Sequence, residues 1–501
     1  MFPRWFLDKR NGKRAQSADF VVQSYCGMGV GEVSYGGRTW HFGRIVSAPT
    51  LSEGCKPVPI SLLPWLQEAA PPAVVPADTA WMLVATALVL LMTPALGFFY
   101  GGLVRSKNSL NTMMMSFAAL GAVGVVWAGL AYSLAFAEGT PLIGGLAHIG
   151  LAGIGLEAKG TIPHVLFMAY QGTFAIITAA LISGAVVERM RFGPYLAFII
   201  LWTLFVYAPV AHWVWGGGFL MTKGVLDFAG GTVVHINAGI SALVAAAVLG
   251  TRKDYGRQAI VPHNVPFTLL GAGLLWFGWF GFNGGSALAA GELAALAFTN
   301  TFLAPMATLV VWVLLDYFRT GRATAVGCAT GIVVGLVAIT PAAGFVSPSG
   351  ALALGAIAAV PSYFIIVLRS RTRLDDSLDV FAGHGIGGLT GALLTGVFAQ
   401  KAWNAAGNDG LLAGNAGQLV VQAIGAATSL VYAGIATFVL LKLISLVAPL
   451  RAAERTEGMG MDVSQHGEEA YSNGEGSILV MPDSQPSPAP AATLAPQTAT
   501  R

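Results

Sequence analysis

The stretch TAWMLVATALVLLMTPALGFF, residues 79–99, runs for 21 residues without a charged side chain. Coiled as an α-helix, an apolar run of this length crosses a hydrocarbon layer of about 30 Å. Similar runs recur along the chain and number eleven in all: roughly residues 79–99, 112–136, 164–187, 193–211, 232–250, 265–284, 293–316, 323–341, 350–368, 380–399 and 416–446. We therefore predict an all-α integral membrane protein with about eleven transmembrane helices.

The composition agrees with this fold class. Of the 501 residues, 55% are hydrophobic and 10% are charged, against about 25% charged residues in a typical soluble domain. The net charge of +3 does not indicate nucleic-acid binding, because the basic residues form no contiguous patch. The three cysteines, Cys26, Cys55 and Cys328, are too scattered for a disulfide framework or a thiolate metal site. We expect no cofactor and no redox chemistry.

The loops between the apolar runs alternate in charge. Short cytoplasmic loops collect lysine and arginine, and every second loop here does so: Arg105 and Lys107; Arg189 and Arg191; Arg252, Lys253 and Arg257; Arg319 and Arg322; and Arg369, Arg371 and Arg373. The intervening loops hold little more than Lys159, Lys223 and Lys401. The alternation places the start of the first helix outside and the carboxyl terminus inside, in a multi-pass protein of the cell (inner) membrane.

The two ends differ from the membrane domain, which we place at residues 76–450. Residues 1–75 carry a basic cluster between Arg4 and Arg14 and lack the continuous apolar core of a secretory signal. We expect this arm to be disordered or absent from the mature protein. Residues 473–501 are rich in proline, alanine, serine and threonine, a composition that predicts a disordered extension.

The first ten helices divide into two sets of five. A set with an odd number of crossings leaves the next set upside down, and inverted repeats of this kind place substrate paths between the halves. His235, near the start of the fifth helix, and His384, near the start of the tenth, each follow an aspartate, Asp227 and Asp379. We therefore predict a five-plus-five inverted repeat; chance placement of the two histidines is the alternative.

Polar and aromatic clusters interrupt the apolar segments at QGTFA (171–175), AHWVWGGG (211–218), DFAGGTVVHINA (227–238), GFNGGS (281–286) and DVFAGHG (379–385). Polar groups cost free energy inside a bilayer, so those retained there tend to serve a pathway. The predicted topology brings Phe174, Trp215, Phe282 and Ser286 to one external vestibule. Aromatic faces beside a hydroxyl acceptor suit a small cation. The alternatives are ordinary packing for the two phenylalanines and an interfacial belt position for Trp215.

Such a vestibule can hold a cation but cannot carry it through a dry helix bundle. An aromatic face attracts a cation by about 0.5 to 2 kcal/mol, whereas moving a small ion into a low-dielectric medium costs on the order of 20 kcal/mol. Ammonium has a way round this barrier, because it can release a proton and proceed as neutral ammonia.

Imidazoles suit that step, since neutral histidine both donates and accepts hydrogen bonds. His235 and His384 are therefore candidate pore residues, and Asp227 could favour positive charge at the external site. An ordinary polar contact between helices is the alternative for each histidine, and a helix cap is the alternative for Asp227.

Seven motifs together resemble, in order, those of the Amt/Mep/Rh ammonium transporter family, of the bacterial Amt type: GFFYGGLVRSKN (97–108), QGTFA (171–175), AHWVWGGG (211–218), LDFAGGTVVHINAG (226–239), GWFGFNGGSA (278–287), DVFAGHGIGG (379–388) and DVSQHGEEAY (462–471). The resemblance runs from about Asp78 to Tyr471. It implies a transporter or channel for ammonium and its analogue methylammonium, assembled in membrane lipid as a homotrimer with one pore in each subunit. Tyr170 and Thr173 depart from the phenylalanine and serine that many members have there.

The resemblance also assigns roles to residues. It implies that Phe174, Trp215 and Ser286 recruit ammonium, that Phe174 and Phe282 stack as a gate, and that Asp227 supports the recruitment site without contacting the ion. It implies that His235 and His384 are hydrogen-bonded to each other in the pore. Residues 451–472 resemble a cytoplasmic regulatory tail, and a PII-type signal protein is the implied partner at that face.

Two other functions compete with transport. An ammonium sensor that signals to a cytoplasmic partner would bind ammonium without passing it. A membrane redox enzyme would need histidine ligands, but the eight histidines show no HExxH pattern and no closely spaced pair on one helix. We therefore do not expect an enzyme.

Overall fold

The computed structural model describes residues 22–24, 31–35, 38–42 and 73–471, in two units that divide at residue 70. In the first unit, strands β1 (Val22–Ser24), β2 (Gly31–Tyr35) and β3 (Arg38–Phe42) pair antiparallel in the order β1-β2-β3. The rest of the arm before residue 73 and the extension at 473–501 lie outside the described residues. The expectations for both ends stay predictions.

The second unit is almost entirely helical, which confirms the predicted fold class. Its principal helices are α1 (Pro76–Leu103), α2 (Ser109–Val126), α3 (Tyr132–Phe136), α4 (His164–Val186), α5 (Phe192–Trp202), α6 (Ala208–Trp215), α8 (Asn237–Leu249), α9 (Val265–Gly285), α10 (Glu292–Thr320), α11 (Ala325–Ile339), α12 (Pro348–Arg369), α13 (Gly387–Phe398) and α14 (Ala416–Val447). Short pieces lie between or after them: α7 (Phe219–Thr222), the two-residue strands β4 (Ala158–Lys159) and β5 (Ile162–Pro163), and α15 (Glu454–Met459) and α16 (Met461–His466).

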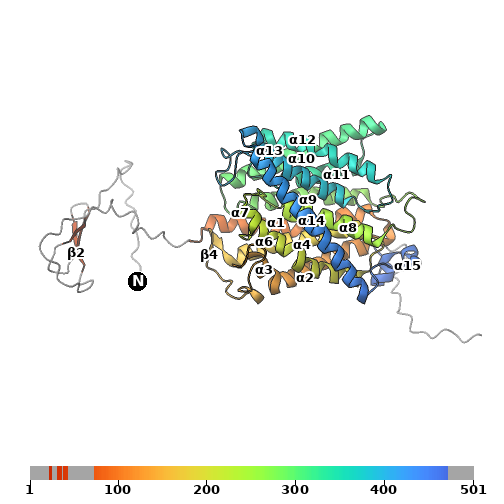
Figure 1. Ribbon diagram of the computed structural model, residues 1–501, viewed down its shortest axis with the longest axis horizontal. Helices are drawn as coiled ribbons and strands as arrows, with labels where there is room; N and C mark the ends of the chain where they lie inside the picture. Colours follow the sequence, from red (N-terminus) through yellow and green to blue (C-terminus); the bar gives the residue numbers. More distant parts are fainter. Residues whose placement is uncertain (1–21, 25–30, 36–37, 43–72, 472–501) are drawn as a thin grey trace, which may run out of the picture. The chain divides into compact units, whose positions relative to one another are not determined.

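Ten of the described helical segments are long and apolar enough to cross a membrane. Each of the eleven predicted runs overlaps a helix, and the one outside this set of ten is α11, with 15 residues. The protein is therefore a multi-pass membrane protein, while the count of eleven crossings stays a prediction. The long helices run side by side between one end that carries α7 and β4 and another that carries α15 (Figure 1). We call the second the tail end.

Four π-helical segments interrupt the bundle: η3 (Trp127–Ala131), η5 (Thr203–Tyr207), η6 (Gly231–Ile236) and η7 (Phe381–Ile386). Single-turn π segments are often found at functional sites. Here η6 leads into α8 and carries His235, while η7 leads into α13 and carries His384. The two segments meet because Gly239 lies directly against the backbone of Gly385, where a Cβ atom would overlap the chain. A glycine at this crossing thus brings the two histidine-bearing turns together.

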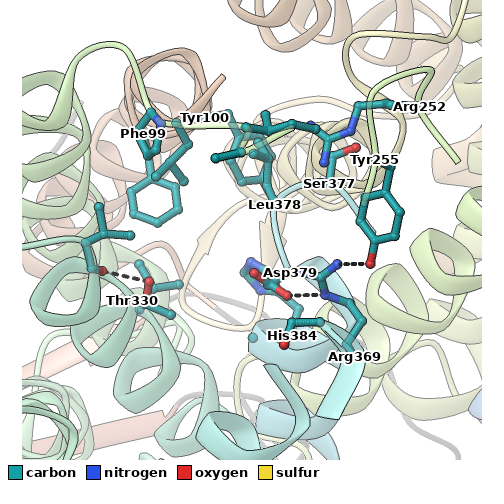
Figure 2. A pocket seen from close by; sticks show the side chains of 18 of the residues that line it. Phe99, Tyr100, Arg252, Tyr255, Thr330, Arg369, Ser377, Leu378, Asp379 and His384 are labelled. Atoms are coloured by element: carbon teal, nitrogen blue, oxygen red, sulfur yellow. Dashed lines mark hydrogen bonds and ion pairs between the residues drawn. The ribbon is translucent and has the colours of Figure 1, made fainter. Parts of the chain in front are cut away.

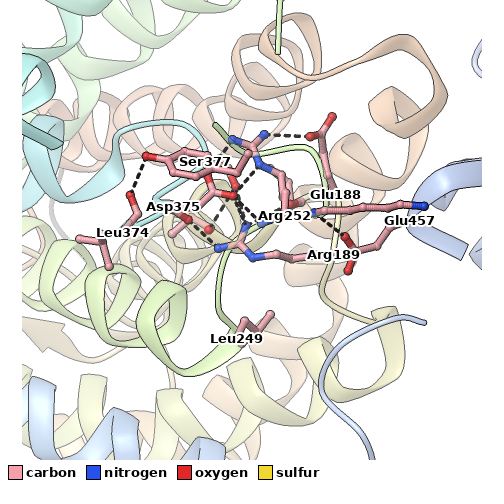
Figure 3. Close-up of polar contacts among 12 residues, drawn as sticks. Glu188, Arg189, Leu249, Arg252, Leu374, Asp375, Ser377 and Glu457 are labelled. Carbon is pink, nitrogen blue, oxygen red and sulfur yellow. Dashed lines mark hydrogen bonds and ion pairs between the residues drawn. The ribbon is translucent and has the colours of Figure 1, made fainter. Parts of the chain in front are cut away.

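Buried charges form a cluster at the tail end (Figure 3). Glu188 accepts from Arg105 Nε at 3.1 Å and from Arg252 Nη1 at 2.8 Å, and Arg252 also pairs with Asp375 at 2.8 Å. Burial alone would raise the pKa of the Glu188 carboxyl, but the guanidinium groups of Arg252 and Arg105 outweigh it and hold that pKa below its usual range. Arg105 and Arg252, which belong to two of the loops predicted to share one side of the membrane, therefore meet in one network of paired charges.

The carboxyl-terminal segment docks beside this cluster. Helix α2 has no side-chain cap of its own, and the Asp462 carboxylate of α16 accepts from the backbone N–H groups of Leu110 and Asn111 at 3.0 and 2.7 Å. Asn108 joins the two regions, since its Nδ2 donates to Glu188 at 2.8 Å and its Oδ1 accepts from Met461 N at 2.8 Å. The tail is thus tied both to a helix N-terminus and to the charge cluster.

Candidate functional site

Two phenylalanines from different helices stack at the centre of the site. Phe174 on α4 and Phe282 on α9 have ring centroids 4.1 Å apart and planes 25° apart, and both side chains are buried. The helix-based prediction that these residues share one site therefore agrees with the geometry. Phe282 also lines the narrow cavity beside the histidines.

Trp215 and Ser286 lie on one side of this stack. Trp215, the last residue of α6, stands edge-on to Phe174 with centroids 6.0 Å apart, and its Nε1 donates to the carbonyl of Asp227 at 2.8 Å. Ser286, the residue after α9, donates from Oγ to the carbonyl of Phe282 at 2.8 Å. Both side chains are partly exposed. The three predicted recruitment residues thus lie at the phenylalanine pair: Phe174 belongs to it, Trp215 packs on the Phe174 ring, and Ser286 bonds to the Phe282 carbonyl.

Asp227 caps η6. Its carboxylate accepts from four backbone N–H groups, those of Gly230 and Gly231 at 2.9 and 2.6 Å and those of Thr232 and Val233 at 2.8 and 3.0 Å. The side chain is buried, and such bonds are what make a buried carboxylate tolerable. The helix-cap alternative describes this contact correctly. Because the Asp227 carbonyl also accepts a hydrogen bond from Trp215 Nε1, the same residue helps to position the Trp215 ring.

His235 and His384 meet on the other side of the phenylalanine stack. Their Nδ1 atoms are 3.2 Å apart, and their rings are 23° from parallel. One nitrogen must carry a proton and the other must accept it, so the two imidazoles hold complementary tautomers. The helix assignment alone placed these residues near opposite surfaces, whereas the resemblance implied the contact that the structure contains.

Trp279 is a residue of the site that sequence reasoning missed. Its ring stacks on His235 with centroids 5.4 Å apart, and its Nε1 donates to Thr340 Oγ1 at 2.9 Å. His235 also stacks with Phe282 at 6.1 Å. The signal was present in GWFGFN (278–283), because Trp279 precedes Phe282 by three residues and so shares its helix face.

A narrow cavity runs beside the two imidazoles. Its remaining wall is apolar and is formed by Met92, Leu96, Phe99, Ile177, Leu181, Val234, Leu275 and Val333, together with Trp279 and Phe282. It leaves about 10 Å³ for the centre of a water-sized molecule, which is room for about one such molecule. Among the described residues, His235 Nε2 is buried with no hydrogen-bond partner. The passage therefore suits a small neutral molecule that can hydrogen-bond.

Beyond His384 the space widens into a second cavity of about 510 Å³ (Figure 2). Asp379 and Arg369 pair on its wall, and Arg369 also reaches the Tyr255 hydroxyl at 3.4 Å. The sequence comparison with Asp227 had selected Asp379, but the capping carboxylate is Asp376, whose Oδ2 accepts from Phe381 N at 2.7 Å. Asp376 precedes His384 by eight residues, as Asp227 precedes His235. Asp379 faces Arg369 instead because its backbone turns into the left-handed region there, with φ of 57°.

Residues 80–471 match the model of the Ammonium Transporter Family. The chain belongs to this family. It is 49% identical over 398 residues to an ammonium transporter of Bacillus subtilis, covering 79% of this chain and 98% of that one. Among solved structures, it is similar to Mep2 of Saccharomyces cerevisiae, with a TM-score of 0.74 and 36% identity, covering 81% of this chain and 93% of the other. It is also similar to a sensor Amt protein, with a TM-score of 0.73 and 29% identity over 78% and 98% of the two chains.

The family match confirms the resemblance found in the motifs and supports ammonium as the substrate. In this ammonium transporter the aromatic and polar residues found in the apolar helices are neighbours. Trp215 and Ser286 lie next to the stacked phenylalanines, and the two imidazoles line the narrow apolar cavity. The individual roles of these residues are taken up as proposals.

Proposed function

We propose that this ammonium transporter recruits the cation at Phe174, Trp215 and Ser286, that the ion gives its proton to external water before the stacked pair of Phe174 and Phe282, and that the remaining ammonia passes His235 and His384. One observation carries the proposal: rings follow one another without a break from Trp215 through both phenylalanines to the two imidazoles, and they end at a cavity with room for about one small molecule.

The recruitment step uses two aromatic rings, those of Trp215 and Phe174, and the hydroxyl oxygen of Ser286. The faces of Trp215 and Phe174 attract a cation by about 0.5 to 2 kcal/mol. Ser286 adds an oxygen with free lone pairs, because its own proton is donated to the Phe282 carbonyl. Ammonium, which has N–H donors in every direction, can use the oxygen and the rings at once.

The deprotonation step follows from the cost of burying charge. The wall of the cavity below the phenylalanines is apolar apart from the two imidazoles, and an isolated ion there would cost far more than the aromatic faces return. Ammonia avoids this cost. The bond between the two Nδ1 atoms gives the imidazoles opposite tautomers, so His235 Nε2 donates to ammonia in one arrangement and accepts from it in the other.

The finer topology belongs to the same proposal. We place the tail end in the cytoplasm, because the basic loops gather there. The matching turns η6 and η7, each with a histidine eight residues after a capping aspartate, support the five-plus-five inverted repeat. The resemblance to the family also supports our proposals of a homotrimer and of a PII-type partner at the cytoplasmic face.

A sensor is the second candidate. One similar structure is a sensor Amt protein, at 29% identity, but the relatives at 49% and 50% identity are ammonium transporters, so transport is the stronger candidate. Reconstituted vesicles separate the two functions, because a sensor would bind ammonium with no flux, whereas a transporter would pass it.

The test compares histidine variants in transporter-deficient cells and in proteoliposomes. His235→Ala and His384→Ala should each lower methylammonium uptake at least tenfold. His148→Ala is the matched control, since His148 lies outside the pore and bonds through Nδ1 to the Ala152 carbonyl. Uptake at the level of the unmodified protein in both pore variants would contradict the proposal, as would potassium flux comparable with ammonium flux.

A further inference from the structure

The last turn of α9 leaves one carbonyl without its usual partner. In an α-helix the carbonyl of residue i accepts from the N–H of residue i+4, so Phe282 should be bonded to Ser286. The Ser286 N–H instead bonds to Asn283 at 3.1 Å, in a tighter turn. The carbonyl that is released belongs to the phenylalanine stacked on Phe174.

Two hydroxyl groups take the place of the missing N–H. Ser286 Oγ lies 2.8 Å from the Phe282 carbonyl, and the hydroxyl of Tyr170 on α4 lies 2.9 Å from it. The Tyr170 hydroxyl is also 3.0 Å from the Gly281 carbonyl and 3.3 Å from Ser286 Oγ. Gly285 leaves room for it, since a Cβ there would lie 2.7 Å from the hydroxyl oxygen.

The protons in this group can be assigned by counting donors. Carbonyls only accept, so Tyr170 gives its single proton to the Phe282 carbonyl, to the Gly281 carbonyl or to Ser286 Oγ, which can donate to Tyr170 in return. Ser286 therefore gives its proton either to the Phe282 carbonyl or to Tyr170. In both arrangements Ser286 Oγ presents only lone pairs to a ligand.

We propose that Tyr170 is a positioning residue of the recruitment site. Its hydroxyl fastens α4 to the end of α9, holds Phe282 against Phe174 and keeps Ser286 as an acceptor. The Tyr170 hydroxyl is buried and bonded to these neighbours, so we assign it a role in positioning them and not in contacting the ion. Its ring packs on Phe174 with centroids 5.0 Å apart. The inference rests on the proposed recruitment of ammonium at Phe174, Trp215 and Ser286.

The test measures ammonium flux in proteoliposomes as a function of concentration. Tyr170→Phe removes one oxygen and keeps the ring, so the ammonium concentration for half-maximal flux should rise about fivefold, the effect of one neutral hydrogen bond, while the maximal rate changes less than about twofold. Ser286→Ala should raise the ammonium concentration for half-maximal flux by at least as much. Because the two hydroxyls act as a unit, the double variant should show no further rise beyond Ser286→Ala.

Tyr195→Phe is the matched control. Tyr195 is also buried and donates across two helices to a backbone carbonyl, that of Met115 at 3.1 Å, but it has no part in the recruitment site. Its removal should lower thermal stability without moving the half-maximal concentration. If Tyr170→Phe assembles poorly, Gly285→Ala displaces the same hydroxyl with the tyrosine retained, and it should give the same shift.

The outcomes separate the two proposals. An unchanged half-maximal concentration in Tyr170→Phe, with a raised one in Ser286→Ala, would overturn the role of Tyr170 and leave recruitment intact. A loss of stability in Tyr170→Phe like that of Tyr195→Phe, with no shift in concentration, would also overturn it. Unchanged values in Ser286→Ala and Trp215→Leu as well would overturn the recruitment site itself.

Discussion

The passage through the membrane and the charge cluster at the tail end bury polar groups in opposite ways. In the passage, His235 Nε2 has no partner among the described residues, and the wall around it is largely apolar. In the cluster, Glu188 is as deeply buried, yet both of its oxygens accept from arginines. The difference teaches what each group can do: the Glu188 carboxylate is committed to its arginines, whereas the free His235 nitrogen lines a cavity and can bond to a molecule that enters it.

The largest loss of stability should come from breaking the paired charges of the cluster around Glu188. Glu188→Ala leaves Arg252 and Arg105 without their shared carboxylate, and removal of one partner of a buried ion pair costs about 3 to 5 kcal/mol. Thermal unfolding of the purified protein measures it. Asp254→Asn is the control, because Asp254 pairs with Arg105 at 2.8 Å at the partly exposed rim, where such a pair is worth about 0 to 1 kcal/mol. Equal losses in the two variants would contradict the distinction.

The caps of the two histidine turns should differ by a smaller amount. Asp227→Ala removes the acceptor of four N–H groups and should destabilise the protein by about 2 to 3 kcal/mol. Asp376→Ala should cost less, because Asp376 Oδ1 has no partner in the described part of the chain. The corresponding asparagine variants, which keep one acceptor oxygen, should recover part of each loss. A larger loss at Asp376 would reverse the assignment of the stronger cap.

The pH dependence of stability should distinguish paired from unpaired carboxylates. The pKa of Glu188 and that of Asp375 are lowered by Arg252, so their contribution is present above the unfolded pKa of about 4 and is lost as the pH falls through the folded values. Burial and the neighbouring Asp379 raise the pKa of Asp376 to about 6, so this group lowers stability as the pH rises from about 4 to above 6.

Unfolding temperatures measured from about pH 2 to pH 8 test both directions. Asp376→Asn should flatten the decline between about pH 4 and pH 6, and Glu188→Gln should weaken the loss at acid pH. An unchanged profile in Asp376→Asn would show that its carboxyl titrates alike in the folded and unfolded states.

The smallest effect is expected within the passage itself. Trp279→Phe keeps an aromatic ring over His235 but loses the bond to Thr340, at a cost of about 1 kcal/mol. Trp276→Phe is the matched control, since Trp276 donates to the Thr301 carbonyl at 3.1 Å and does not line the cavity. Both should lose similar stability, but only Trp279→Phe should change methylammonium flux. Equal flux in the two variants would show that Trp279 has no specific role in conduction.

Hydropathy and motif order predicted most of the fold, because apolar length and loop charge act locally along the chain. The structure brings Phe174 onto Phe282 and His235 onto His384, but neither contact could be inferred from spacing, and the roles of these residues stay predictions. His235 and His384 are far apart in sequence and meet only because Gly239 fits against Gly385. Asp379 was taken as the counterpart of Asp227, since a sequence does not show that its backbone turns toward Arg369. In the sequence Tyr170 and Trp279 cannot be told from aromatic residues that only pack. Their roles emerge from the structure, which gives the hydrogen-bond partners of the Tyr170 hydroxyl and of Trp279 Nε1.

The size of the cavity beside the imidazoles has an energetic consequence for the cell. Protons move rapidly along water when many molecules form an unbroken hydrogen-bonded file, each passing a proton to the next. A space with room for about one such molecule cannot contain a file. Water in this cavity therefore gives protons no continuous route across the membrane. By that route, an open transporter does not dissipate the electrochemical gradient that other membrane proteins use.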